Sequence, residues 1–335
     1  MTTPRVSILM PVHNEERYLP LALASLQRQT FTDWELVVVD DHSTDGTLHL
    51  LRGAVARDGR IRVISSPERG LVPALNAGLA ACRAPFVARM DGDDVSHPRR
   101  LEKQYGRLCH RPEEGLVACS FRHFPRQTLR DGMRAYEAWQ NELLSHDDVM
   151  RDLFVESPFV HPSVMFRKCE VERLGGYRDM GWAEDYDLWL RLAAAGVRFG
   201  RLPETLFFWQ DHPRRATRTM GEYSAAAFRA CKAHHLQSGF LAGRDELILA
   251  GAGQEGRAWY RTLAEVGIRV GLWVDVDPRK TGRVLHGARV VSASEFVPDG
   301  RPMLVTVGTR GARAGIRQWA TTAGFKEGTD FVCVT

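Results

Sequence analysis

Short apolar runs alternate with segments of helical periodicity over residues 1–100. The apolar runs predict strands that are buried on both faces, and they lie at 6–12, 35–39, 61–64 and 86–90. The intervening segments predict helices at 16–29 and 72–82, and Ser43 or Thr44 is expected to cap a third helix that carries Leu48 and Leu51. Buried strands separated by helices are typical of an α/β fold, with a Rossmann-like, mostly parallel sheet flanked by helices.

A second alternation of this kind begins near the C-terminal end. A strand at 246–250 precedes a glycine-rich segment and a helix that continues to residue 264, and further strands follow at 270–274 and 303–307. A strand at 163–166 and a helix at about 185–195 are expected to join the first sheet. We therefore predict one domain over residues 1–215, a helical linker over 216–244 and a smaller Rossmann-like α/β domain over 245–335.

Composition narrows the class of protein. The 335 residues carry 45 basic and 41 acidic side chains, a net charge of +4 that does not suggest a nucleic-acid partner. The six cysteines form no C-x-x-C pair, which favours a reducing compartment. No signal-type segment or membrane-spanning apolar run is present, so we expect a cytoplasmic protein for which peripheral contact at the inner membrane face and homo-oligomer formation are both allowed.

Acidic residues follow the predicted strands where ligands collect in such sheets. Asp91 and Asp93 come directly after the strand at 86–90, and a small glycine separates them. Carboxylates are the ligands that Mg²⁺ or Mn²⁺ prefers, and the phosphates of a bound substrate would complete the coordination. The alternative is an Asp-rich turn held by local hydrogen bonds, which is the commoner explanation of an isolated D-G-D sequence.

Two further carboxylates invite functional interpretations. Asp40 ends the second strand, where it could accept hydrogen bonds from a nucleobase or a ribose; its alternative role is to cap the next helix. Asp185 lies on a loop at the expected start of a helix, where it could take a proton from an attacking hydroxyl group. An acidic helix N-terminus stabilised by the helix dipole explains Asp185 equally well.

Four segments together resemble the signature of family 2 glycosyltransferases of the GT-A fold: 11–15, 38–47, 90–94 and 183–189. The resemblance covers about residues 6–210 and implies an inverting, metal-dependent transfer from a nucleoside-diphosphate sugar donor. It also implies roles for individual residues. Pro11, His13, Glu15 and Asp40 would line the nucleotide pocket. Asp91 would bind the ribose or the metal, Asp93 would bind the metal, and Asp185 would act as the general base. Three further residues would belong to the substrate site: Arg69, His161 and Glu184.

The family's processive polysaccharide synthases carry a Q-x-x-R-W motif and transmembrane helices, and this chain has neither. We therefore expect a single-addition enzyme that modifies a saccharide or lipid-linked acceptor at the cytosolic face. In the C-terminal domain, Gly251, Gly253, Gly256 and Asp275 have the spacing of a nucleotide or cofactor site. Two alternatives remain: an NAD(P)-binding oxidoreductase that uses this glycine motif, and a catalytically inactive nucleotide-sugar-binding protein.

Overall fold

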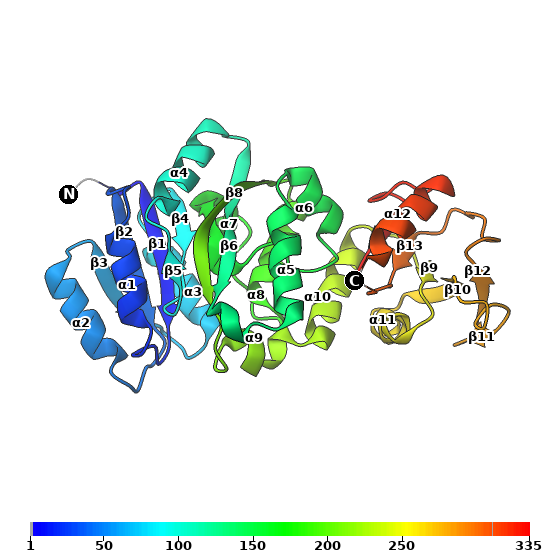
Figure 1. Ribbon diagram of the computed structural model, residues 1–335, viewed down its shortest axis with the longest axis horizontal. Coiled ribbons are helices and arrows are strands. Elements are labelled where there is room, and N and C mark those ends of the chain that lie inside the picture. Colours follow the sequence, from blue (N-terminus) through cyan, green and yellow to red (C-terminus); the bar gives the residue numbers. More distant parts are fainter. Residues whose placement is uncertain (1–2, 310) are drawn as a thin grey trace. The chain divides into compact units, whose positions relative to one another are not determined.

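A computed structural model describes residues 3–309 and 311–335. The chain forms two compact units, and two short internal segments belong to the second. The first unit runs to Val149 and includes Pro158–Met180 and Glu184–Met220; the second consists of Met150–Ser157, Gly181–Ala183 and Gly221–Thr335. In Figure 1 the first unit runs from blue to green, and most of the second from yellow-green to red.

The first unit contains an eight-stranded sheet with the order β3-β2-β1-β4-β7-β6-β8-β5. Its strands are β1 (Val6–Val12), β2 (Trp34–Asp40), β3 (Ile61–Ser65), β4 (Phe86–Arg89), β5 (Val95–Ser96), β6 (Glu114–Phe124), β7 (Val164–Arg167) and β8 (Arg198–Gln210). The helices are α1 (Leu19–Gln27), α2 (Thr47–Arg57), α3 (Leu71–Ala81), α4 (Arg100–His110), α5 (Asp131–Glu142), α6 (His146–Asp152), α7 (Lys168–Glu172), α8 (Glu184–Ala194) and α9 (Ala216–Thr219). The end of α6, from Met150 on, belongs to the second unit. Short 3-10 turns span Arg126–Thr128 and His161–Ser163.

Strands β1 to β4 form the parallel half of this sheet, and β7 joins it in the antiparallel direction. Every residue of β1 and β2 is buried, which explains why these strands read as continuous apolar runs. In the β1–β2 register Val12 lies opposite Asp40, so both strands deliver their following residues to one edge. The predicted α/β fold with a mostly parallel sheet is confirmed, and the segment around residues 163–166 joins it as predicted.

The second unit is a smaller α/β structure with a six-stranded sheet of order β11-β12-β10-β9-β13-β14. All neighbours are parallel except β11 and β12. Its elements are the 3-10 turn Gly221–Tyr223, α10 (Ala225–Ser238), β9 (Glu246–Ala250), α11 (Gln254–Glu265), β10 (Arg269–Asp275), β11 (Val284–Leu285), β12 (Ala288–Ser292), β13 (Met303–Val305), α12 (Ala312–Thr322) and β14 (Phe331–Cys333). Trp259 and Trp273 are fully buried in its core.

The predicted cap of the third helix is wrong. Helix α2 begins at Thr47 rather than near residue 44, and the Asp45 carboxylate accepts the Thr47 backbone N–H at 3.0 Å. Ser43 and Thr44 instead bind the loop after β1: the Ser43 hydroxyl accepts the Asn14 N–H, and the Thr44 N–H donates to the Asn14 side chain. A long-range contact therefore uses the side chains that local sequence assigned to the helix end.

Membrane insertion through a helix finds no support in the described part of the chain. None of its helices combines the length and the apolar character that a bilayer crossing requires.

Close packing of α3 on the sheet depends on Gly78. A Cβ atom at this position would lie 2.1 Å from Cδ1 of Leu9 and 2.7 Å from Cγ2 of Val39. Because both neighbours are core side chains, we expect Gly78→Ala to destabilise the fold by about 1–3 kcal/mol in urea denaturation. The control is Gly106→Ala in α4, where a Cβ meets nothing within 4 Å; it should stabilise the fold by about 0.5–1 kcal/mol. An unchanged unfolding midpoint for Gly78→Ala would contradict this packing.

Candidate active site

The loops that follow β1 and β2 are joined by hydrogen bonds. Nδ1 of His13 lies 2.6 Å from the Asp41 carbonyl oxygen, and Nε2 of His13 lies 3.1 Å from the Asn14 side-chain nitrogen. Asn14 and His42 both adopt positive φ angles, 56° and 54°, so each loop turns sharply as its strand ends. The contact between His13 and Asp41 therefore holds the two loops together.

The neighbouring acids Asp40 and Asp41 have different environments. Both carboxylate oxygens of Asp41 accept the Gly70 N–H, at 2.9 and 3.0 Å, which fixes the loop that carries the exposed Arg69. Asp40 is 3% exposed; its Oδ2 accepts the Ser43 N–H at 3.4 Å, and its Oδ1 has no partner among the described residues. A buried acceptor without a partner costs free energy unless a ligand supplies a donor, so Asp40 is suited to bind one.

Asp91, Asp93 and Asp94 follow β4 and bring carboxylate oxygens within 4.8 Å of one another. Gly92 permits this, because a Cβ atom there would lie 2.9 Å from Cγ1 of Val12 and 3.1 Å from Cγ of Glu15. The acidic loop therefore packs directly against the residues that follow β1, and the two predicted metal ligands lie together with a third acid, Asp94.

The electrostatics of this loop favour a cation. Burial and the charges of Asp93 and Asp91 raise the pKa of Glu15 from 4.5 to about 8. The same three causes raise the pKa of the fully buried Asp94, whose Oδ2 has no partner among the described residues. Clustered hard oxygen ligands whose charges oppose one another suit Mg²⁺ or Mn²⁺, because a divalent cation would offset the repulsion. The residues therefore fit the predicted metal.

His212, from the segment after β8, completes this side of the site. Its Nε2 lies 2.8 Å from Oδ2 of Asp93, and its ring stacks on Tyr18 at a centroid distance of 4.8 Å. The exposed Arg214 is close enough for its charge to lower the pKa of Glu15. Sequence reasoning missed His212, because nothing local links that residue to Asp93.

His161, Tyr177, Glu184 and Asp185 form a second group. Nε2 of His161 lies 2.9 Å from the Tyr177 hydroxyl, and its Nδ1 faces Oε1 of Glu184 at 3.4 Å. Asp185 lies in the first turn of α8 rather than on a loop before it, and its Oδ1 accepts the Tyr186 N–H at 2.7 Å. Burial and the charge of Glu184 raise the pKa of Asp185 well above its ordinary range, as suits a group that must accept a proton.

Contacts inside the chain account for several residues of the C-terminal glycine loop. Gly251 has φ 112°, and a Cβ on Gly256 would lie 1.9 Å from the Gly251 carbonyl oxygen, so both positions require glycine. The Asp275 carboxylate accepts the N–H groups of Ala252 and Asp277 and the Lys280 ammonium group, at 2.7–2.9 Å. Cofactor binding by Gly251, Gly253, Gly256 and Asp275 stays a prediction.

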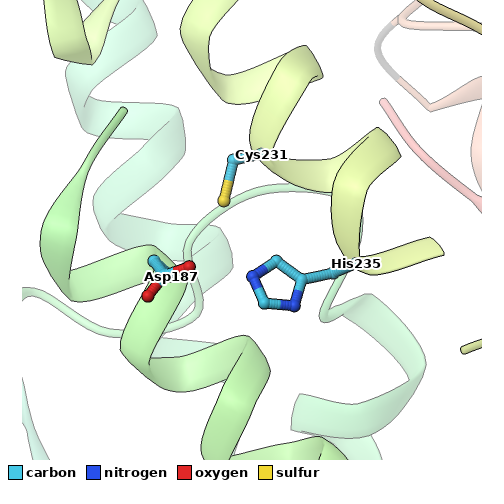
Figure 2. Close-up of side chains that lie close together, drawn as sticks. All are labelled: Asp187, Cys231 and His235. Carbon is cyan, nitrogen blue, oxygen red and sulfur yellow. The ribbon is translucent and has the colours of Figure 1, made fainter. Parts of the chain in front are cut away.

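Figure 2 shows three further side chains of residue types that can bind a metal, Asp187, Cys231 and His235. Cys231 and His235 lie one turn apart on α10 in the second unit. Asp187 comes from α8 in the first unit, where its Oδ2 pairs with Nε of Arg191 at 2.7 Å. This ion pair gives Asp187 a structural role within its own unit.

Comparison with known proteins agrees with this geometry. The sequence profile of Glycosyl transferase family 2 matches residues 7–175, half of the chain. The chain belongs to glycosyl transferase family 2. It is 32% identical over 241 residues to EpsE of Bacillus subtilis (strain 168), which is named as a glycosyltransferase; the match covers 68% of this chain and 82% of EpsE. It is 28% identical over 235 residues to the O-antigen biosynthesis glycosyltransferase WbnJ of Escherichia coli, covering 69% and 87%.

A solved structure shows the same fold. The mannosyltransferase PcManGT of Pyrobaculum calidifontis, in complex with GDP-Man and Mn²⁺, superimposes with a TM-score of 0.52 at 23% identity; the match covers 70% of this chain and 63% of that one. The first unit therefore has a GT-A-type fold, and membership of family 2 makes the chain a glycosyltransferase. The oxidoreductase alternative is not favoured, because the family match over residues 7–175 does not include the glycine loop at 251–256.

From the raised pKa of Glu15 we predict how the free energy of unfolding depends on pH when a chelator keeps the protein free of metal. Between pH 4.5 and about 8 the folded state keeps a proton on Glu15 that the unfolded state loses. This contribution is therefore complete below pH 4.5 and is lost as the pH rises towards 8, with a slope of about 1.4 kcal/mol per pH unit.

Urea denaturation at several pH values checks this, and Asp94 should add to the slope in the same direction. Glu15→Gln should reduce the slope, and saturating Mn²⁺ should reverse the loss. The control Glu16→Gln, a neighbouring residue outside the acidic cluster, should leave the slope unchanged. A wild-type slope equal to that of Glu15→Gln would refute the assigned environment.

Proposed function

We propose that this family 2 enzyme transfers a sugar, with inversion, from a nucleoside-diphosphate sugar to a hydroxyl group of a saccharide or lipid-linked acceptor. The process it serves would be the synthesis of cell-surface polysaccharide or glycolipid, as the names of relatives such as WbnJ suggest. One observation carries the proposal: acids from separate segments of the chain gather at one edge of the sheet and shift one another's pKa values.

On the donor side, the partnerless oxygen of Asp40 would accept a hydrogen bond from the nucleobase or ribose, beside Pro11 and His13. Arg69 would contact the diphosphate or base from the loop that Asp41 fixes. Asp93, with Asp91 and the adjacent His212, would hold Mg²⁺ or Mn²⁺, which supplies positive charge to the leaving diphosphate. The Mn²⁺ and GDP-Man in the mannosyltransferase neighbour support this choice of ligands.

On the acceptor side, Asp185 would take the proton from the acceptor hydroxyl as its oxygen attacks the anomeric carbon. The bond from that carbon to the phosphate oxygen breaks, and the diphosphate leaves with the bonding electrons. Attack from the face opposite the diphosphate inverts the anomeric configuration. His161 and Glu184, which face each other at 3.4 Å, would position the sugar or the acceptor.

The remaining assignments concern location and the second unit. We place the reaction at the cytosolic face of the inner membrane, with a single sugar added in each encounter. For the C-terminal unit we propose a binding or regulatory role, with nucleotide contacts through Gly251, Gly253, Gly256 and Asp275.

Thermal stabilisation by a panel of nucleotide sugars tests the donor side. With Mn²⁺, one donor and its nucleoside diphosphate should raise Tm, and chelator should abolish the effect. Asp93→Asn should lose this metal-dependent stabilisation, whereas Asp147→Asn, at an exposed acid on α6, should keep it. Equal stabilisation of Asp93→Asn and wild type would rule out Asp93 as a metal ligand.

Asp185→Asn tests the acceptor side. The amide cannot accept the proton, so kcat should fall by about 10²–10⁴-fold. The donor affinity should change less than about twofold, because Asp185 makes no donor contact in this assignment. Transfer assays with the stabilising donor and isothermal calorimetry separate the two quantities, and a variant with normal kcat would exclude Asp185 as the base.

A further inference from the structure

Arg89 is a buried cation between the two halves of the site. It ends β4 with a side chain only 2% exposed, and its Nη2 lies 2.7 Å from Oδ1 of Asp91. Nη1 donates to the Met90 carbonyl oxygen, and Nε has no partner among the described residues. Burying an arginine costs free energy unless an opposite charge pairs with it. Among the described residues, the ion pair of Arg89 is with Asp91 of the acidic loop after β4.

The sheet places the end of β4 beside the start of β7. The two strands are antiparallel, with Ala88 opposite Met165, and His161 lies in the turn directly before β7. A second buried arginine, Arg100, joins the two backbones: its Nη2 donates to the carbonyl oxygens of Arg89 and Val164, at 2.8 and 3.2 Å. The end of β4, from which the Arg89 side chain projects, is therefore held beside the segment that carries His161.

The charge of Arg89 acts on both halves of the site. Burial opposes its positive charge, yet the carboxylates of Asp91 and Glu184 and the Tyr177 hydroxyl keep the pKa of Arg89 above its ordinary value. Conversely, Arg89 counteracts the burial and the Glu184 charge that together raise the pKa of Asp185. The groups that face Asp185 are Glu184 and the Tyr186 N–H on α8, Arg89 from β4, and Tyr177 from the loop before α8.

We propose that Arg89 is a positioning residue that couples the two halves: its forked guanidinium fixes Asp91 for the donor, and its positive charge acts on the acids of the acceptor-side group. This inference rests on the proposed function. The two contributions are separable, because a lysine keeps the charge but has only one nitrogen to replace two differently directed N–H groups.

Arg89→Lys and Arg89→Met test the coupling through two readouts. The first is the affinity for UDP or GDP with Mn²⁺, measured by thermal stabilisation. The second is the acidic limb of the pH profile for slow donor hydrolysis, in which water is the acceptor. Both variants should lose at least about tenfold in affinity, the cost of one charged hydrogen bond. Only Arg89→Met should move the acidic limb, by about one pH unit upwards.

Arg201→Lys is the matched control. Arg201 is also buried, but its guanidinium donates only to backbone carbonyls, those of Leu143, Cys119 and Pro158. It should lower Tm without changing either readout. If both Arg89 variants behave like Arg201→Lys, Arg89 is merely structural and the inference fails. If Arg89→Met does not fold, Arg89→Lys decides: weakened affinity supports the positioning of Asp91 by Arg89, and wild-type affinity overturns it.

The wild-type protein separates this inference from the function on which it rests. If no nucleotide stabilises wild type with Mn²⁺, the proposed function fails, and the inference fails with it. If wild type is stabilised but the Arg89 variants match Arg201→Lys, only the inference fails.

Discussion

Mutual repulsion among clustered carboxylates, of which Asp94 is buried and the others partly buried, is the constraint on which this site depends. Glu15, Asp91, Asp93 and Asp94 approach one another where burial already disfavours charge, and the raised pKa values of Glu15 and Asp94 record the cost. The chain limits this cost through Arg89 beneath Asp91 and His212 beside Asp93. A cation bound among these carboxylates would offset their repulsion. The same charges therefore influence metal affinity, donor binding and the stability of the fold.

Sheet topology decides which chemical groups become neighbours. The parallel strands β1, β2 and β4 deliver the donor-side residues to one edge, as parallel strands must. The antiparallel strand β7 then brings His161 to the end of β4, although the two segments are far apart in sequence. The proposed donor and acceptor halves of the site therefore meet across a single strand pair, and a charge at the end of β4 can influence both.

The second unit shows how a motif and its use can differ. Its sheet order reverses at β9, directly before the glycine loop, as in nucleotide-binding folds. Gly251 and Gly256 are nevertheless explained by backbone geometry, and contacts within the unit occupy the Asp275 carboxylate. The same spacing would result from a need for tight packing alone, so the motif identifies the fold more firmly than it identifies a ligand.

By itself, the sequence determined the alternating strands and helices over residues 6–90 and the acids that follow these strands, because hydrophobic periodicity and position after a strand are local properties. The strands around residues 6–12 and 246–250 and the roles suggested for Asp40, Asp91 and Asp93 could be inferred in this way. The sequence did not indicate the long strands β6 and β8. Only the tertiary structure decided that Ser43 and Thr44 bind Asn14, that Asp41 holds Gly70, and that Arg89 and His212 contact the acidic loop after β4. These contacts join segments that only the strand order brings together, and no local pattern encodes the resulting balance of charge.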